Sequence, residues 1–532
     1  FVPRPAESGE YGTPLVTVGD PFAEMRGDGA ITLTGFALTP SLSADLQLEP
    51  FEVFSMNATL IAASDAGDAT LARPELLLLR GYVVGNAPSS VFLAITPTSI
   101  NGRIELGKDT YVISSGAPGA GQDPIIYNIA DVPAGVWNFD PFVCAADQLG
   151  RIAVAETPAA PDAGLRTGPC RVARIAIETD WEFRQIFGSD AGASAYAATL
   201  LGAVSEIYKR DLNISFEISF LRIWNTSSDP WTQSDTVNQL YEFRDYWNVN
   251  MTGVSREIAT FFSGRALGGG VAWLGVVCYP EYDYSLSANL NGFFPYPIQN
   301  NSPDNWDLMV LAHELGHNFG APHTHNQSPP VDNCAGGDCS VAPNGTIMSY
   351  CHLCGNGLAD VRMEFHPQTV NSYMLPYLAD PNVCDITVAP PTITAHPSGA
   401  DLCAGSDYTL TVVAGGRVTG YQWRHDGVDL PGETASSLSL TNVGSADAGS
   451  YDVVVSNECH QVTSNAAVVT VCAGGAPGDL NNDCAVDLTD LALLLADFDC
   501  NGGGCAGDVD GDGDTDLTDL AVLLANFDAP CP

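Results

Sequence analysis

Apolar and polar positions alternate with different periods in successive stretches of the chain. Residues 1–167 carry short alternating runs, such as 31–36 and 90–95, separated by Gly, Pro, Asn, Asp and Ser. This pattern predicts β-strands joined by turns. After Cys170, strand-like and helix-like periods alternate, which indicates an α/β fold. There we expect strands at 174–179, 214–224 and 270–278, and helices at 191–210 and 307–318.

The last two stretches differ again. Residues 385–471 have turn signals about every eight to twelve residues, which predicts an all-β fold. In the final stretch an internal repeat is present, because 479–496 recurs at 508–525. We therefore expect a multidomain chain with a β-rich domain at 1–168, an α/β domain at 169–384, an all-β sandwich at 385–473 and a small helical module at 474–532.

Composition excludes several classes of function. The 532 residues are 45% hydrophobic, enough for several cores, and no apolar run approaches the roughly 20 residues of a membrane-spanning helix. Lys and Arg total 20 against 63 Asp and Glu, a formal net charge of −43. Such acidity excludes a nucleic-acid binder that works through phosphate contacts and disfavours docking on anionic lipid. No basic residue follows Arg424, which favours a solvated tail or bound cations.

Fifteen cysteines, mostly in spaced pairs, favour an oxidising compartment with disulfides. The chain starts at Phe1 without a basic and apolar leader, so we expect a secreted protein, extracellular or at the cell surface, whose signal peptide has been removed. An odd number of cysteines leaves at least one thiol unpaired within the chain.

One motif has metal-ligand spacing: His313-Glu-Leu-Gly-His317, followed by His323. Residues four apart share a helix face, so His313 and His317 can hold one ion. Glu314 lies near the same face, where it can hold a water and take its proton. A left-handed Gly320 would end the helix and bring His323 to the third corner. Three imidazoles and one open position predict one catalytic zinc ion.

Met348 follows within Gly-Thr-Ile-Met-Ser-Tyr, and a Met in a tight turn below the zinc is a second mark of the metzincin peptidases. The chain resembles this family, and within it the adamalysin/reprolysin-like group, also through 211–224 and 270–278. The resemblance implies that 270–278 is an edge strand binding extended substrate by strand addition. It implies hydrolysis of peptide bonds in proteins, with Glu314 as the general base.

The resemblance has one departure, because Cys351 follows Met348 whereas adamalysins usually have a Cys just before it. Tyr350 stands where astacin-like and serralysin-like relatives carry a zinc-binding tyrosine. It is a candidate zinc ligand or oxyanion donor, and a structural role is the alternative. His325 is interpreted as a surface histidine rather than a spare ligand.

Residues 36–114 resemble a reprolysin propeptide, through 46–51, 80–91, 101–104 and 111–113. Cys144 and Asp147 have the C-x-x-D form of metzincin cysteine switches. The resemblance implies a zymogen in which the Cys144 thiolate takes the water's place on zinc. The alternative is a disulfide between Cys144 and Cys170. Removal would require a cut in the Pro-rich linker 158–169, where Arg166 is a candidate site.

The other cysteines allow several pairings. The resemblance implies a Cys278–Cys384 disulfide. Two disulfides are expected among Cys334, Cys339, Cys351 and Cys354, with a second zinc site as the alternative.

The third stretch resembles an immunoglobulin-like sandwich, because Trp423 is followed by a tyrosine corner at Tyr451. Val453 stands where the usual second cysteine would be, so Cys403 is expected to pair with Cys459 or Cys472. Spacing or adhesion is the expected role of this domain.

The terminal repeat carries oxygen ligands at loop positions 1, 3, 5, 9 and 12, which predicts two calcium ions. The ligands are Asp479, Asn481, Asp483, Asp487 and Asp490, then Asp508, Asp510, Asp512, Asp516 and Asp519. Two such loops, each running into a Leu-rich helix, resemble a type I dockerin. The resemblance implies a cohesin-like partner facing Leu488-Thr489 and Leu517-Thr518, with a partnerless calcium-stabilised cap as the alternative. Four cysteines are expected to staple the module: Cys484, Cys500, Cys505 and Cys531.

Two hypotheses follow. The first is a secreted zinc metalloendopeptidase made as a zymogen. The second is a latent cell-surface or scaffold protein that binds through its immunoglobulin-like and dockerin-like modules. The intact set of His313, His317, His323 and Glu314 favours the enzyme.

Overall fold

The computed structural model divides the chain into two units, Phe1–Thr387 and Val388–Pro532, which are described separately. It describes residues 2–3, 12–16, 20, 22, 25, 30–117, 123–132, 137–138, 144–149, 169–292, 302–303, 306–342, 344–472, 476–481 and 484–528. No helix among these residues meets the length and hydropathy that crossing a membrane requires.

The alternating runs of the first stretch form an antiparallel sheet of nine strands, in the order β1-β2-β11-β10-β9-β8-β7-β4-β3. The strands are β1 (Val2–Pro3), β2 (Thr13–Val16), β3 (Ile31–Thr39), β4 (Leu42–Phe51), β7 (Leu77–Val83), β8 (Ser89–Ile95), β9 (Ile100–Leu106), β10 (Asp109–Ser114) and β11 (Ile125–Asn128). This confirms the β-rich character expected of the N-terminal region.

A second sheet of the same unit has the order β16-β17-β15-β13-β14-β5-β6. Its strands are β5 (Phe54–Ala63), β6 (Ala69–Thr70), β13 (Arg171–Thr179), β14 (Ile214–Trp224), β15 (Ile258–Phe262), β16 (Gly270–Ala272) and β17 (Tyr284–Ser287). The core of this sheet is parallel, and β16 and β6 pair antiparallel at its two edges. Two strands of the N-terminal region, β5 and β6, thus belong to the sheet of the α/β domain.

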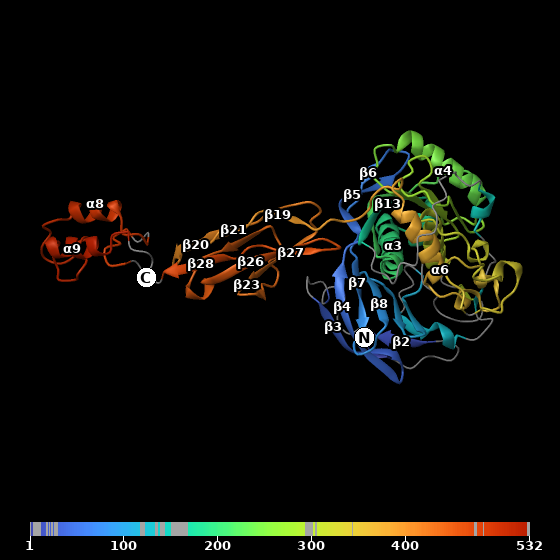
Figure 1. Ribbon diagram of the computed structural model, residues 1–532, viewed down its shortest axis with the longest axis horizontal. Coiled ribbons are helices and arrows are strands. Elements are labelled where there is room, and N and C mark those ends of the chain that lie inside the picture. Colours follow the sequence, from blue (N-terminus) through green and yellow to red (C-terminus); the bar gives the residue numbers. More distant parts are fainter. Residues whose placement is uncertain are drawn as a thin grey trace. The chain divides into compact units, whose positions relative to one another are not determined.

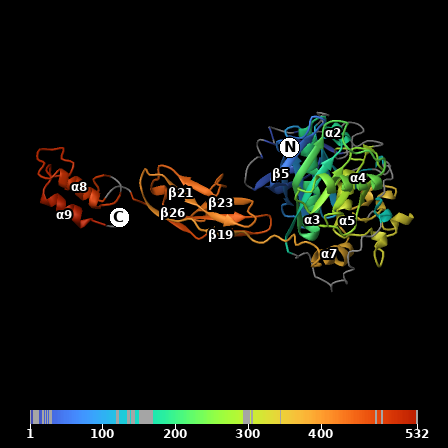
Figure 2. The same cartoon turned by 90° about the horizontal axis from the view of Figure 1, so that it is seen from above.

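Helices pack on this sheet. They are α2 (Trp181–Phe187), α3 (Asp190–Leu212), α4 (Thr236–Asn250) and α5 (Trp306–Asn318). Two short helices, α6 (Pro367–Thr369) and α7 (Leu375–Ala379), follow later in the chain. Figure 2 shows α3 and α5, which pack against each other. Figure 1 shows strands β7 and β8 beside α3. A short parallel pair joins β12 (Trp137–Asn138) to β18 (Ser302–Pro303), just before α5.

The expected strand at 270–278 is much shorter than predicted. β16 ends at Ala272, because the following chain bonds to the end of α5 instead of to a neighbouring strand. Gly275 N–H donates to the His317 carbonyl at 2.8 Å, and Val276 N–H donates to the Asn318 carbonyl at 3.0 Å. The predicted edge position is confirmed.

The second unit contains a β-sandwich and two helices. The strands are β19 (Thr392–Ala395), β20 (Ala400–Cys403), β21 (Tyr408–Thr411), β22 (Val413–Gly415), β23 (Gly420–His425), β24 (Val428–Asp429), β25 (Ser437–Leu440), β26 (Gly449–Ser456), β27 (Gln461–Thr463) and β28 (Ala467–Cys472), and the helices are α8 (Leu488–Ala496) and α9 (Leu517–Ala525). Trp423 is fully buried in the sandwich core. The Tyr451 hydroxyl donates to the Asp447 carbonyl at 2.9 Å, as in a tyrosine corner.

Disulfides confirm some pairings and correct others. Cys278–Cys384, Cys334–Cys351 and Cys339–Cys354 agree with expectation and leave no thiols there for a second zinc. The expected pairing of Cys403 with Cys459 or Cys472 is wrong, because Cys403 is bonded to Cys484. Cys484 therefore ties the sandwich to the terminal module, while Cys500–Cys505 lies within that module. Cys531 lies outside the described residues.

Candidate metal centre

Helix α5 is buried along its whole length, so its polar residues must have partners in the protein interior. The helix ends where the sequence predicts. Gly320 has a left-handed φ of +87°, its N–H donates to the His317 carbonyl, and Ala321 N–H donates to the Gly316 carbonyl, each at 2.9 Å. A Cβ at Gly320 would approach the Tyr377 ring to 3.0 Å. The turn places His323 opposite the two histidines of the helix.

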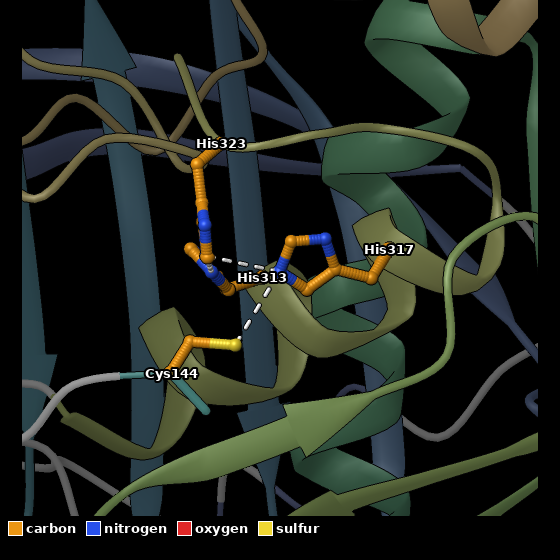
Figure 3. Close-up of side chains that lie close together, drawn as sticks. All are labelled: Cys144, His313, His317 and His323. Carbon is orange, nitrogen blue, oxygen red and sulfur yellow. Dashed lines mark hydrogen bonds between the residues drawn. The ribbon is translucent and has the colours of Figure 1, made fainter. Parts of the chain in front are cut away.

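The three histidines converge through their Nε2 atoms (Figure 3). His323 Nε2 lies 3.1 Å from His317 Nε2 and 3.2 Å from His313 Nε2. Cys144 Sγ lies 3.4 Å from His317 Nε2, so the thiol closes a four-membered donor set. Tetrahedral zinc with Zn–N near 2.1 Å and Zn–S near 2.3 Å requires ligand atoms about 3.3–3.6 Å apart. The observed separations of 3.1, 3.2 and 3.4 Å lie at or just below this range, and three imidazoles with one thiol are donor types that suit zinc.

Each imidazole is oriented through its other nitrogen. His313 Nδ1 donates to the Ile347 carbonyl at 2.6 Å, and His317 Nδ1 donates to the Ala321 carbonyl at 2.7 Å. His323 Nδ1 donates to a carboxylate oxygen of Asp147 at 3.1 Å. These bonds fix the tautomers that leave Nε2 free to ligate. Burial lowers the pKa of His313 and of His317 well below the usual range, which keeps both rings neutral, as metal ligands must be.

Glu314 is buried beside the histidines, and burial raises the pKa of its carboxyl well above the usual value. The Cys144 thiol donates to its Oε2 at 3.3 Å. A Cβ at Gly270, in edge strand β16, would collide with the Glu314 carboxylate. The carboxylate therefore occupies space that only glycine at position 270 leaves open.

Met348 lies beneath the helix and is fully buried. A Cβ at Gly316 would come within 2.6 Å of the Met348 sulfur, so the turn and the helix are in close contact. Thr324 N–H donates to the Met348 carbonyl at 3.0 Å, which ties the turn to the segment that follows His323. The predicted position of Met348 under the histidines agrees with this packing.

The segment around Cys144 crosses the centre and is held from several sides. Ala145 N–H donates to the Gly270 carbonyl at 3.0 Å, and the Tyr350 hydroxyl donates to the Cys144 carbonyl at 2.8 Å. Cys144 is a free cysteine, whereas Cys170 is disulfide-bonded, so the alternative Cys144–Cys170 disulfide is wrong. Tyr350 contacts this segment, and the half-buried ring of His325 stacks on His323 with centroids 5.1 Å apart.

Sequence reasoning missed the roles of Asp147 and Gly270. Asp147 accepts from His323 and, at 3.0 Å, from Asn326 Nδ2. The C-x-x-D spacing was the available signal for Asp147. For Gly270 the signal was weaker, because a glycine in a strand often marks only a bulge or a tight bend.

Equivalent residues in the two loops of the terminal repeat make several of the same hydrogen bonds. In the second loop, Asp519 accepts from the backbone of 509, 510 and 516, and Asp508, Asp510 and Asp519 place oxygen atoms within 4.8 Å of one another. In the first loop, Asp490 accepts from 480, 481 and 487 in the same way.

Two other predicted ligands cap the repeat's helices. Asp487 and Asp516 accept from the backbone N–H of Thr489 and Thr518, each at 2.6 Å. Asp479 and Asp508 both accept from the backbone N–H of the sixth loop residue, at 2.9 and 3.0 Å. Asp512 accepts from the backbone N–H of Asp514, and Asp483 lies outside the described residues.

Comparisons with known proteins agree with the geometry. Residues 170–358 match the reprolysin-like model of metallo-peptidase family M12, and 390–457 match the immunoglobulin domain. The chain is 26% identical over 198 residues to the disintegrin and metalloproteinase domain-containing protein B of Aspergillus fumigatus, covering 33% of this chain and 23% of that protein. It is also 26% identical over 181 residues to the snake venom metalloproteinase TM-1 of Protobothrops mucrosquamatus, covering 33% of this chain and 81% of that protein.

Among solved structures, the tandem Ig repeats of Dlar match with 21% identity and a TM-score of 0.15, covering 16% of this chain and 48% of that one. The two family matches show a reprolysin-like metallopeptidase domain, for which the family implies a catalytic zinc, and an immunoglobulin-like domain. It spans about a quarter of the length of the first relative.

Proposed function

We propose that the chain is an extracellular zinc-dependent endopeptidase that hydrolyses peptide bonds in proteins and is made as a zymogen. The observation that carries this proposal is the convergence of three oriented imidazoles, one buried carboxylate and one free thiol on a single point. The metallopeptidase domain match supports the reaction class. The disulfides of the catalytic domain support an oxidising, extracellular location.

In this proposal His313, His317 and His323 hold the zinc ion, which would supply Lewis-acid polarisation of the substrate carbonyl and a more acidic water. Glu314 takes the proton of the attacking water and returns one to the leaving amine. The raised pKa of the buried Glu314 carboxyl suits a group that accepts and then gives up a proton.

Substrate positioning is assigned to residues that now hold the Cys144 segment. The Gly270 carbonyl, which accepts from Ala145 N–H, is free to accept from a substrate N–H once that segment leaves. The Tyr350 hydroxyl, which donates to the Cys144 carbonyl, can donate in the same way to the carbonyl under attack. A small cavity beside Glu314 is lined by Trp306, Met309, Val310 and His352 as well as by Cys144, so it would widen once the Cys144 segment leaves.

Latency is assigned to Cys144. A thiolate is a strong zinc ligand, and its sulfur lies where the fourth ligand of the donor set belongs. The same residue contacts Glu314, so the thiol also occupies the space of the attacking water. The uncut chain is therefore proposed to be inactive.

The deciding experiment compares hydrolysis of a quenched casein substrate by the uncut parent chain, by Cys144→Ala and by Cys144→Ala with Glu314→Gln, each checked for bound zinc. Cys144→Ala is expected to be more active than the uncut parent chain because the thiol no longer occupies the water's position, and Cys144→Ala with Glu314→Gln is expected to retain zinc but to lose at least about 100-fold in kcat. Chelation should abolish the activity and added zinc restore it. Equal activity with and without Glu314 would refute the proposed mechanism, and no zinc in any form would refute the metal site.

For the terminal module we propose two calcium ions and a cohesin-like protein partner. The repeated hydrogen-bond pattern around Asp490 and Asp519 supports two equivalent loops. Leu488 and Leu517, at equivalent positions of the repeat, are 72% and 70% exposed, which supports a partner-facing role. Calcium titration by calorimetry should give two sites in the full chain and one in Asp519→Asn. Two sites in that variant would contradict the assignment.

A further inference from the structure

The N-terminal strands form part of the interior of the catalytic fold. β5 pairs in parallel with β14 over most of its length. Ile218 N–H donates to the Val53 carbonyl at 2.6 Å, and Asn225 N–H donates to the Ala63 carbonyl at 3.0 Å. β14 therefore has hydrogen-bonded neighbours on both sides, β13 and β5, and nearly all its residues are buried. A strand of this kind belongs inside a sheet rather than at its edge.

Helix α3 also relies on the N-terminal strands to cover its buried surface. Every residue of 196–205 is buried, so the helix has no solvent-facing stripe and needs cover on all sides. Part of that cover comes from the N-terminal sheet. A Cβ at Gly202 would lie 3.0 Å from Leu78 Cδ1 and 3.4 Å from Phe92 Cε2. Leu78 and Phe92 belong to one continuous apolar core with Leu201 and Val204.

Charged groups at the border of this core are paired across it. Arg210 of α3 donates to Glu105 of β9 at 2.6 Å, and Arg80 of β7 lies 3.6 Å from Glu206 of α3. Burial opposes ionisation of Glu105, but Arg103 and Arg210 hold its pKa at about 2. Separation of the N-terminal sheet from helix α3 would leave Arg210 without Glu105 as a partner.

We infer that residues 30–132 are a permanent part of the mature protein and not a removable propeptide. A cut between Leu149 and Pro169 would break the chain but leave β5 in the sheet and β7 and β8 on α3. The product is a molecule of two chains, in which the N-terminal chain still pairs with the edge of β14 and still covers the apolar surface of α3. The inference goes beyond the proposed peptidase function and needs no catalysis to be tested.

The test uses the full chain with Glu314→Gln, so that it cannot cut itself, and with a recognition site for a sequence-specific protease placed within 158–168. After complete cutting, gel filtration and intact mass are measured at submicromolar concentration, and thermal unfolding is recorded. We expect both fragments to elute together, to separate only in denaturant, and to unfold in one transition. An N-terminal fragment that elutes alone, with an unchanged unfolding temperature for the remainder, would overturn the inference.

A pair of substitutions on α3 distinguishes a shared core from simple adhesion. Gly202→Leu fills the space of Leu78 and Phe92, whereas Ala191→Leu adds the same side chain at an exposed position of the helix. We expect Gly202→Leu to make the cut fragments dissociate at least tenfold more readily and Ala191→Leu to have no effect. If the N-terminal fragment stays bound equally well in Gly202→Leu and in Ala191→Leu, the inference is contradicted. If Gly202→Leu does not fold, the elution of the cut parent chain decides.

Discussion

Removal of the Asp147 carboxylate should loosen the segment around Cys144 by a calculable amount. The carboxylate accepts from His323 Nδ1 at 3.1 Å and from Asn326 Nδ2 at 3.0 Å. Hydrogen bonds to charged groups contribute about 1.5–3 kcal/mol in favourable cases. The Asp147 side chain is 54% exposed, however, and exposed charge pairs contribute about 0–1 kcal/mol. We therefore assign about 1 kcal/mol to these contacts, equivalent to about a fivefold change in the ratio of open to closed segment.

The assay is the rate at which iodoacetamide alkylates Cys144 in the zinc-loaded Glu314→Gln chain, followed by peptide mass. Asp147→Ala should be alkylated about five times faster than its parent, and raised salt should reduce the difference because it screens the charge. Gln148→Ala, at an exposed neighbouring position, is the matched control and should react at the parent rate. An unchanged rate for Asp147→Ala, or an equal acceleration in Gln148→Ala, would refute the reasoning.

Three further outcomes are expected. Gly320→Ala should destabilise the fold by about 1–3 kcal/mol and reduce bound zinc, because φ is +87° and the added Cβ would meet Tyr377. The control is Gly253→Ala, whose Cβ would meet nothing within 4 Å and which should unfold like the wild type in calorimetry. Tyr350→Phe in the Cys144→Ala chain should lower kcat about 100-fold at unchanged KM in steady-state kinetics, and an effect on KM alone would contradict oxyanion stabilisation. The pKa of Glu105 is about 2 in the folded chain and about 4.3 in the unfolded chain, so the stabilisation it contributes is fully present above pH 4.3 and is lost as pH falls toward 2. The melting temperature of Glu105→Gln should lack this dependence on pH. The same dependence of melting temperature on pH in the variant and the wild type would contradict the prediction.

The metal centre could be anticipated from sequence because its geometry is decided locally. His313 and His317 share a face of one helix, and one left-handed residue, Gly320, sets the direction to His323. Both features depend on near neighbours in the chain. The identity of Ile347 as the carbonyl partner of His313 could not be anticipated, since it depends on how a distant loop packs against the helix.

Long-range pairing accounts for what the sequence left open. The alternation of β5 is compatible with either sheet, and only burial against β14 and α3 decides which sheet it joins. For cysteines the spacing does not determine connectivity, and Cys403 accordingly pairs with Cys484 outside its own sandwich. Asp147 belongs to the C-x-x-D motif, but its hydrogen bond with His323 could be recognised only in the folded chain.

The retained attachment of β11 and the residues after it bears on how latency ends. Cys144 follows Val132, which packs against the shared core, by only twelve positions in the sequence. Under our proposal, a thiol joined to the retained part by so short a segment stays near the three histidines even after a cut beyond Leu149. A single cut beyond Leu149 would then leave the proposed inhibitory thiol attached to the retained part, and dilution would not remove it. Release of the thiol would require a second cut between Val132 and Cys144, so on this proposal the number of cuts sets the threshold for activity.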